Sequence, residues 1–327
     1  MTAAMLGGGV PLVLAALLAE VLVGALPGVR AALAAPAAAV SAAAGWFERR
    51  LNRARRGTRM LALRGLIVVV ILVGLAAAAG ALLDAAVGGA RWGEAVHVAA
   101  LAFLIGFRPR LDAARRVGRA LAAGDAEAAR GALAAAGQTD VGAGDQHALA
   151  RTAIESLTER LAGGVVGIAF WYVLLGLPGA FAFRAANAVA ARIGLPTPHL
   201  ATFGLCAAKL DEALRYVPAL AAGLLVSLAA LFVPGASAGR ALRTLLRDGR
   251  RHPLPSAGWI DGAAAGALGL ALAGPRRIGG YTLPGPWIGD GRARATAQDV
   301  HRSCWLAGVA WLFVVAALAL FIVAARP

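Results

Sequence analysis

Long apolar stretches alternate with short arginine-rich stretches along the chain. A membrane-spanning helix needs about 20 predominantly apolar residues. The stretches that meet this requirement are residues 8–27, 62–83, 164–183, 216–234 and 305–325. Residues 93–107 are also apolar, but they are few, and they would cross a membrane only if their helix continues into its polar flanks. The pattern therefore predicts an all-α fold, a polytopic integral membrane protein with about five to six membrane helices.

The composition supports this prediction. Of the 327 residues 60% are hydrophobic and only 15% are charged, whereas soluble domains carry about 25% charged residues. An ordinary soluble protein is thereby excluded, and one membrane domain over residues 1–327 is expected. The net charge of +15 comes almost entirely from arginines beside the apolar stretches. Such placement suits anionic lipid and topology control, so we expect membrane lipid as a partner and no nucleic acid.

The arginine clusters also predict which loops face the cytoplasm, because short cytoplasmic loops carry an excess of Lys and Arg. By this rule the loop between the first two spans, residues 108–119 and residues 240–251 are cytoplasmic. Residues 62–83 and 93–107 must then form a membrane hairpin, which requires residues 93–107 to span. The chain is accordingly predicted to be a multi-pass protein of the cell's inner (cytoplasmic) membrane.

Two regions between the spans are polar enough to lie outside the bilayer. Residues 108–163 are predicted to form a cytoplasmic helical insertion, in which two helices flank a Gly/Asp-rich turn at residues 137–145. Residues 235–304 are predicted to be a cytoplasmic or interfacial loop region with a Gly/Pro/Arg motif. Within it, residues 259–273 are small, apolar and interrupted by glycine, and are expected to form a re-entrant or surface helix.

Glu155 and Glu159 are the first candidates for chemistry. They are four residues apart and therefore share a helix face. Two carboxylates on one face can bind Mg²⁺ or act as an acid and a base. The competing interpretation is a solvated helix face on which Arg151 pairs with Glu155.

A second charged group lies just before the apolar stretch 216–234 and consists of Lys209, Asp211 and Glu212. Ionisable side chains at the edge of a bilayer are costly and often functional, although interfacial anchoring would also explain them. Asn187 follows the apolar stretch 164–183. It could be a helix cap, an interhelical hydrogen-bonding residue or a functional residue.

The segment 273–291, AGPRRIGGYTLPGPWIGDG, concentrates turn residues and charge between two apolar stretches. Glycines such as Gly279 and Gly280 let a backbone approach a ligand closely. Arg276 could clamp a phosphate or a carboxylate with paired hydrogen bonds. Asp290, between two glycines, suits a contact with a metal or a substrate. The alternative is an interfacial loop anchored by its aromatic residues.

These motifs occur in a recognisable order. It runs AIESLTE, FWYVLLGLPGA, FRAAN, FGLCAAKLDE, GPRRIGG and WIGDG. In this order and spacing the chain resembles the cobinamide-phosphate synthase family (CobD/CbiB) of cobalamin biosynthesis, most firmly over residues 140–300. The resemblance implies a membrane enzyme that joins the carboxylate of adenosylcobyric acid to aminopropanol or its phosphate, with ATP and Mg²⁺.

The resemblance also implies roles for the candidate residues. The implied catalytic residues are Glu155, Glu159, Asp211 and Glu212. The implied substrate-binding residues are Asn187, Lys209, Arg276, Gly279, Gly280 and Asp290. Mg²⁺ would be held at Glu155 and Asp211. The implied partners are a corrinoid substrate and other cobalamin-synthesis proteins, and the oligomeric state stays open.

Two features keep alternatives open. The sequence departs from the family pattern at polar positions, with Ala188 after Asn187, Arg160 after Glu159 and Ile278 in the GPRRIGG motif. A non-catalytic paralogue with a scaffold or regulatory role is therefore the alternative, and an unrelated transporter is a third. If residues 164–183 and 216–234 both cross the membrane, residues 184–215 lie outside, away from the substrates that the resemblance implies. Either one of these two stretches does not fully cross, or residues 184–215 fold back into the membrane. We expect re-entry, because the residues of a family site should gather on one side.

Overall fold

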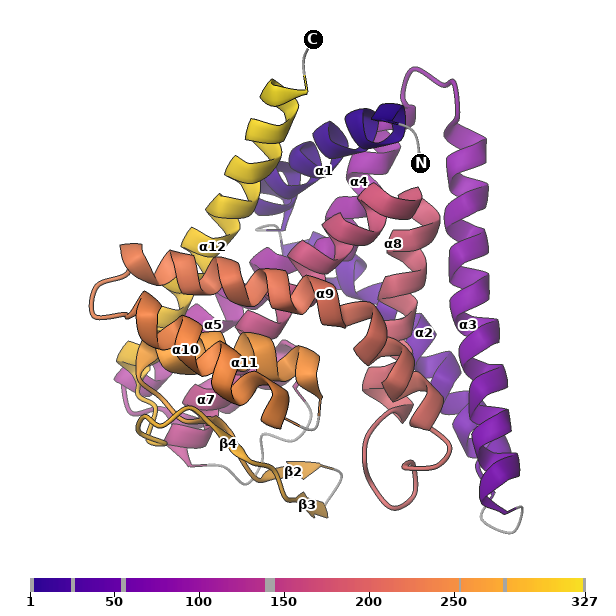
Figure 1. Cartoon of the computed structure of the whole chain (residues 1–327). Coiled ribbons are helices and arrows are strands. Elements are labelled where there is room, and N and C mark those ends of the chain that lie inside the picture. Colours follow the sequence, from indigo (N-terminus) through magenta and orange to yellow (C-terminus); the bar gives the residue numbers. More distant parts are fainter. Residues whose placement is uncertain are drawn as a thin grey trace. The chain divides into compact units, whose positions relative to one another are not determined.

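The structure, a computed structural model, describes residues 3–24, 27–53, 57–138, 145–252, 254–278 and 281–325, and consists mainly of helices (Figure 1). The first helices are α1 (Ala3–Val23), α2 (Pro27–Leu51), α3 (Thr58–Val87), α4 (Gly93–Ile105), α5 (Phe107–Ala122) and α6 (Ala126–Ala135). The later ones are α7 (Gln146–Arg160), the π-helix η2 (Leu161–Gly167), α8 (Ile168–Ile193), α9 (Leu205–Ala229), η3 (Ala230–Phe232), α10 (Ala238–Asp248), η4 (Gly249–Arg251), α11 (Pro255–Leu268) and α12 (Ala297–Ala324).

Within the described residues, four helices are long and apolar enough to cross a membrane. They are Thr58–Val87, Gln146–Ile193, Leu205–Phe232 and Ala297–Ala324. A shorter apolar helix covers Gly8–Val23. The prediction of an all-α polytopic membrane protein is thus confirmed.

Helix α4 contradicts the prediction for residues 93–107. It contains 13 residues, which at about 1.5 Å per residue gives roughly 20 Å, against a hydrocarbon core of about 30 Å. The helix does not continue into a polar flank, because Gly106 ends it in the left-handed conformation and α5 begins at Phe107. The prediction that residues 93–107 span by themselves is therefore wrong.

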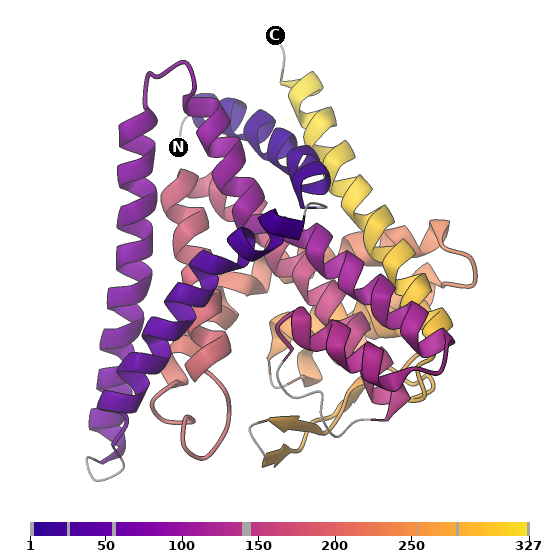
Figure 2. The same cartoon turned by 180° about the vertical axis from the view of Figure 1, so that it is seen from behind.

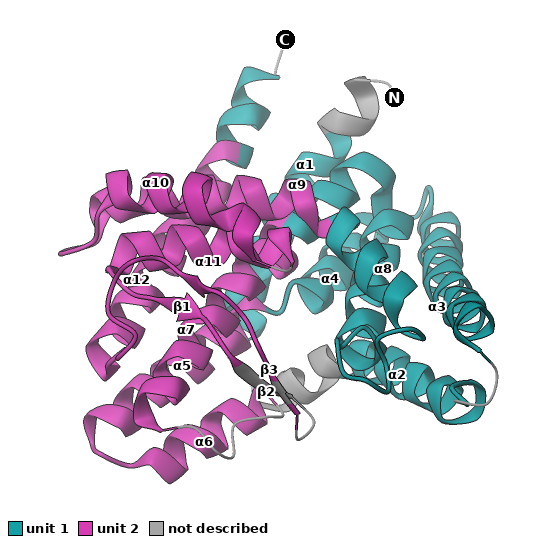
Figure 3. Cartoon of the chain, turned by 60° about the horizontal axis from the view of Figure 1, so that its bottom comes forward, with its two compact units in different colours: residues 1–106, 167–214, 318–327 teal, residues 107–166, 215–317 magenta. Residues whose placement is uncertain are grey.

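The chain divides into two compact units (Figure 3). Unit 1 comprises residues 1–106, 167–214 and 318–327. Unit 2 comprises residues 107–166 and 215–317. The predicted insertion 108–163 belongs to unit 2, where it forms three helices (α5, α6 and α7) rather than two.

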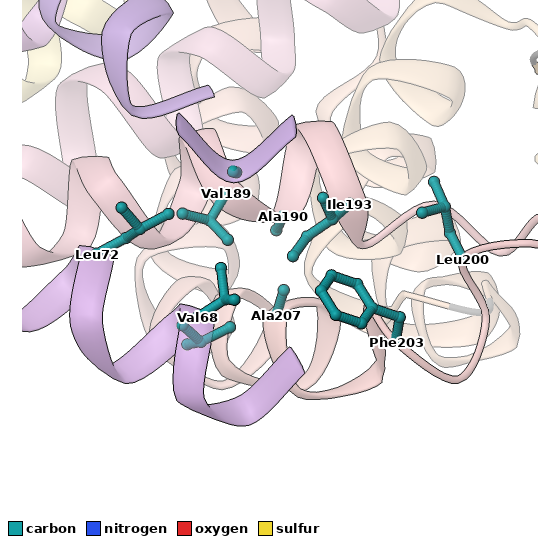
Figure 4. Close-up of a cluster of buried hydrophobic side chains, with 10 residues drawn as sticks. Val68, Leu72, Val189, Ala190, Ile193, Leu200, Phe203 and Ala207 are labelled. Carbon is teal, nitrogen blue, oxygen red and sulfur yellow. The ribbon is translucent and has the colours of Figure 1, made fainter. Parts of the chain in front are cut away.

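In unit 1, α3 packs against α8 and α2 (Figure 2), and α1 packs against α4. The core between α3, the end of α8 and the start of α9 is a cluster of buried apolar side chains (Figure 4). Its members include Val68, Leu72, Val189, Ile193, Phe203 and Ala207. Gly65 brings α3 against the backbone here, since a Cβ at this position would lie 1.8 Å from the carbonyl oxygen of Phe203. The cluster therefore depends on a close approach that only glycine permits.

Helix α8 is broken at Gly176, whose φ of 67° and ψ of −155° are not helical. Pro178 follows at the start of the second half, where its missing N–H costs nothing. A polar network adjoins the break: the His97 imidazole lies 3.0 Å from the Asp84 carboxylate and 2.6 Å from the Tyr172 hydroxyl. Since Asp84, His97 and Tyr172 belong to α3, α4 and α8, this network ties three helices of unit 1 together.

In unit 2, α10 and α11 pack closely. Helix α11 is buried from Ser256 to Leu268, so of the two possibilities expected for residues 259–273, a re-entrant or a surface helix, the surface helix is wrong. The physical reason is a row of glycines. A Cβ on Gly258 would lie 2.0 Å from the Gly249 carbonyl oxygen, and one on Gly266 would lie 2.3 Å from that of Arg240. The small residues that resemble a weak membrane segment are instead a close helix–helix contact.

Four short strands follow α11. Strand β1 (Leu272–Ala273) pairs antiparallel with β4 (Trp287–Ile288), and β2 (Arg276–Ile278) pairs antiparallel with β3 (Tyr281–Leu283). The Gly/Pro/Arg segment that the sequence analysis singled out is therefore folded back on itself, with its two ends held side by side.

Candidate functional site

Glu155 connects helix α7 to the Gly/Pro/Arg segment in unit 2. Its side chain is buried, and its Oε1 accepts a hydrogen bond of 2.7 Å from the backbone N–H of Ala273. Ala273 has a φ of 58°, in the left-handed region that favours glycine. The carboxylate thus holds an unfavourable backbone conformation at the start of the segment, and joins two motifs that lie 118 residues apart.

Two further α7 residues on the same helix face hold the other end of this segment. The Arg151 guanidinium donates to the carbonyl oxygen of Ala293 and lies 5.3 Å from the ring centre of Trp287. The His147 ring lies 2.8 Å from the carbonyl oxygen of Ala295. Helix α7 therefore holds the segment in place through these contacts.

Glu159 lies one turn further along α7 and is half-buried. Burial lowers the pKa of Arg110 on α5, and the charge of Glu159 acts in the opposite direction. Arg110 also donates to the Ser156 hydroxyl at 3.0 Å, as does the Gln138 amide at 3.0 Å. The partly buried Arg110 guanidinium is thus held at Ser156, the residue that follows Glu155.

Asp290 takes part in a charged cluster with the end of α10. Arg247 contacts the exposed Asp290 at 3.0 Å and the buried Asp248 at 2.6 Å. Asp248 also accepts from Arg251 at 3.1 Å and from the backbone N–H of Gly289 at 3.2 Å. Asp248 therefore orients Arg247 and fixes the WIGDG turn that carries Asp290.

The hydrogen bonds from Arg247 dominate the electrostatics of this cluster. They lower the pKa of Asp248, against the opposing effect of burial, and the Gly289 N–H adds to the lowering. They also lower the pKa of Asp290. Both carboxylates raise the pKa of Arg247. The cluster is consequently ionised throughout the neutral range.

Asp248→Asn should destabilise the protein by about 2 kcal/mol, because it weakens the hydrogen bonds that Arg247, Arg251 and the Gly289 N–H donate to a buried carboxylate. A carboxylate with a lowered folded-state pKa stabilises fully above its unfolded pKa and loses this effect as the pH falls through the folded value. The difference in melting temperature between wild type and variant should therefore be largest at neutral pH and shrink below about pH 4. Glu127→Gln, on the exposed α6, is the control. A difference that does not change with pH would contradict the prediction.

Unit 1 holds the remaining predicted residues that the structure describes. The Asn187 amide donates to the Asp211 carboxylate at 3.2 Å and accepts from Arg184 at 3.0 Å. Glu212 is half-buried next to Asp211, and Lys209 is exposed one turn before it. Asn187 thus makes an interhelical hydrogen bond between α8 and α9, one of the roles considered from the sequence.

The structure brings the predicted residues together in two groups, one in each unit. Gly279 and Gly280 lie outside the described residues, and of Arg276 only the backbone is described, in β2. Within the described part of the chain, no three His, Cys, Asp or Glu side chains gather in a way that could hold a metal ion. Glu155 and Asp211, the residues predicted for Mg²⁺, belong to different units.

Comparison with known proteins identifies the family. A family model described as "CobD/Cbib protein" matches residues 13–307. The chain belongs to this family. The match extends over both groups of candidate residues and the whole Gly/Pro/Arg segment. The resemblance inferred from the motifs is therefore confirmed.

Several curated relatives support the assignment to the CobD family. A "Cobalamin biosynthesis protein CobD" from Sinorhizobium sp is 38% identical over 263 residues, covering 79% of this chain and 81% of the relative. One from Brucella melitensis is 35% identical over 288 residues, covering 87% and 88%. One from Rhodobacter capsulatus is 32% identical over 266 residues, covering 79% and 82%. No solved structure matches this CobD-family chain.

Sequence reasoning missed three side chains of the unit 2 group: Arg110, Arg247 and Asp248. All three stand in arginine-rich stretches that were interpreted only as topology signals. In residues 240–251 the one acidic residue, Asp248, is flanked by arginines. The sequence signal for Asp248 was that it is a single carboxylate among arginines, where an acidic side chain indicates an ion pair.

Proposed function

We propose that this chain is an adenosylcobinamide-phosphate synthase, which joins adenosylcobyric acid to aminopropanol or its phosphate through an amide bond. The chain is a CobD-family membrane protein of cobalamin biosynthesis, which makes it a biosynthetic enzyme. The assignment as an adenosylcobinamide-phosphate synthase is supported by the extent of the family match, residues 13–307. It includes all four acids expected to be catalytic. The non-catalytic alternative is not favoured.

Amide formation from an acid and an amine requires removal of a proton from the amine and stabilisation of negative charge. Mg-ATP would supply the driving force and a phosphate leaving group. We assign proton removal to Glu159, because it is half-buried, whereas Glu155 is buried, and a general base must be within reach of substrate. Arg110 and Arg247 offer guanidinium groups of the kind that bind phosphate oxygens.

Glu155 has a different role in this proposal. Its Oε1 is engaged by the Ala273 N–H, so it positions the Gly/Pro/Arg segment and does not exchange protons with substrate. For Mg²⁺, which accepts one or two carboxylates together with substrate phosphates, the exposed Asp290 fits the required chemistry better than the buried Glu155. We further propose that the reaction takes place at the cytoplasmic face of the inner membrane, where the arginine-rich loops are expected.

Glu159→Gln should lower the rate of amide formation by about 10² to 10⁴, the usual contribution of a general base. The assay uses purified protein in detergent with adenosylcobyric acid, aminopropanol phosphate and Mg-ATP, and detects the amide product by mass. Glu127→Gln, an exposed glutamate on α6, should have wild-type activity.

Two outcomes would count against these assignments. Wild-type activity in Glu159→Gln would remove Glu159 from the reaction without affecting the proposed function. Absence of product from the wild-type protein, under conditions in which a purified relative is active, would contradict the function itself.

A further inference from the structure

Helix α10 has a packed face and an exposed face of unusual composition. Ala241, Thr244, Leu245 and Asp248 are buried, and they lie on one side of the helix because successive residues turn by about 100°. Two glycines allow the close packing: a Cβ on Gly223 of α9 would lie 2.6 Å from Leu245, and one on Gly262 of α11 would lie 3.1 Å from it. Helix α10 is therefore fixed rigidly against its neighbours in unit 2.

The exposed face divides lengthwise into an apolar edge and a basic edge. Leu242 and Leu246 are 42% and 61% exposed and are four residues apart, so they form one edge. Arg240, Arg243 and Arg247 are also exposed and form the other edge. Leucines left in water gain nothing from folding. A helix with a basic edge beside an apolar edge is typical of helices that lie in the plane of a membrane interface.

The neighbouring part of α9 places this face next to the bilayer. Residues Leu205–Phe232 form one of the candidate spans. In the last turns of this span the exposed fractions of Leu228, Leu231 and Phe232 are 47%, 64% and 62%. Only five residues separate Phe232 from the start of α10 at Ala238. Helix α10 also contacts η3 at this end of the candidate span, so it begins beside an exposed apolar helix end.

We propose that α10 is an interfacial helix that binds anionic phospholipid, with Arg240 and Arg243 on the headgroup phosphates and Leu242 and Leu246 among the acyl chains. Charge complementarity selects anionic lipid, since the exposed face carries arginines and no acidic residue between Ala238 and Arg247. The exposed leucines argue against a nucleic acid or a soluble anion, because neither would cover them. This inference does not depend on the proposed function.

The binding of lipid to α10 would also affect the charged cluster of Arg247, Asp248 and Asp290. Arg247 stands on the same basic edge, one turn after Arg243, and contacts both Asp248 and Asp290. A lipid-bound α10 would hold the WIGDG turn of unit 2 close to the headgroups. The binding of lipid and the geometry of the charged cluster are therefore linked through one helix.

Site-directed spin labelling in vesicles tests the insertion of the apolar edge. The label is attached at Leu246→Cys in a chain whose Cys206 and Cys304 are replaced by alanine. Oxygen concentrates among acyl chains and a nickel chelate stays in water, so a label at position 246 should be relaxed more by oxygen than by nickel. The control, Glu127→Cys on α6, whose glutamate is 85% exposed, should show the reverse.

Native mass spectrometry tests the basic edge. Protein from vesicles of phosphatidylcholine and phosphatidylglycerol should retain phosphatidylglycerol, with binding weakened about fivefold for each of Arg240→Gln and Arg243→Gln. The matched control is Arg115→Gln with Arg119→Gln, two exposed arginines of α5 that have no exposed leucine beside them.

Three results would overturn the proposal. A label at position 246 that behaves like the one at position 127 would place the apolar edge in water. A label shielded from both relaxation agents would show that protein, and not lipid, covers this edge. Equal retention of phosphatidylglycerol by the α10 and α5 variants would remove the specific role of Arg240 and Arg243.

Discussion

Glu155→Ala should reduce synthase activity by more than about a hundredfold and lower the free energy of unfolding by about 2 kcal/mol. The substitution leaves the buried N–H of Ala273 without its acceptor, which costs about 1–3 kcal/mol. It also releases the left-handed turn at the start of the Gly/Pro/Arg segment, and small displacements of binding groups cost about a hundredfold in rate. Activity is measured by the amide-product assay, and stability by thermal unfolding in detergent.

Glu155→Gln separates positioning from proton transfer. The glutamine side chain keeps an oxygen that can accept from Ala273, so this variant should retain nearly wild-type stability and most of the activity. If Glu155→Gln were as stable as wild type and as inactive as Glu155→Ala, the positioning role would be wrong. Glu155 would then be the catalytic acid or base that the sequence suggested.

Gly65→Ala should destabilise the protein by about 3 kcal/mol, the upper range for overpacking a dense core. The added Cβ would lie 1.8 Å from the carbonyl oxygen of Phe203, which is backbone and cannot rotate away. Helix α3 would have to move off the cluster formed with Val189 and Ile193 (Figure 4). The melting temperature in detergent should fall by several degrees.

Gly74→Ala is the matched control on the same helix. No atom lies within 4 Å of a Cβ at this position, and alanine is a better helix former than glycine by about 1 kcal/mol. Its melting temperature should equal or exceed that of wild type. If Gly65→Ala and Gly74→Ala lowered the melting temperature equally, the contact with Phe203 would not explain the effect of Gly65→Ala.

The apolar pattern predicted the long spans because each needs only length and hydropathy, which are local properties. It misplaced α4 and α11, where tertiary contacts decide. Residues 93–107 have the hydropathy of a span, but Gly106 ends the helix early. The side chains of residues 259–273 are small, so their apolar pattern is too weak to predict a membrane span. The same small side chains allow α11 to pack closely on α10.

The candidate site was predictable where spacing carried the signal. Glu155 and Glu159 share a helix face, and the structure places Glu155 on a backbone N–H and leaves Glu159 half-buried one turn further along. The partners themselves were not predictable. Ala273 contributes only its backbone, which has no side-chain signature. The sequence marks Asp248 as the one carboxylate in a basic stretch, but the backbone N–H of Gly289 that it accepts from again has no side-chain signature.

The division of unit 1 into three separate stretches of sequence has a consequence for how the protein is made. Helix α3 leaves the ribosome about a hundred residues before the end of α8, its main packing partner. At about 5–20 residues per second, α3 waits roughly 5–20 seconds for that partner. Its inner face, with Val68 and Leu72, must meanwhile be covered by lipid or by the insertion machinery. The third stretch of the unit begins at Leu318, after residues 215–317 of unit 2. Unit 1 therefore cannot be completed until residues 107–166 and 215–317 of unit 2 have been translated.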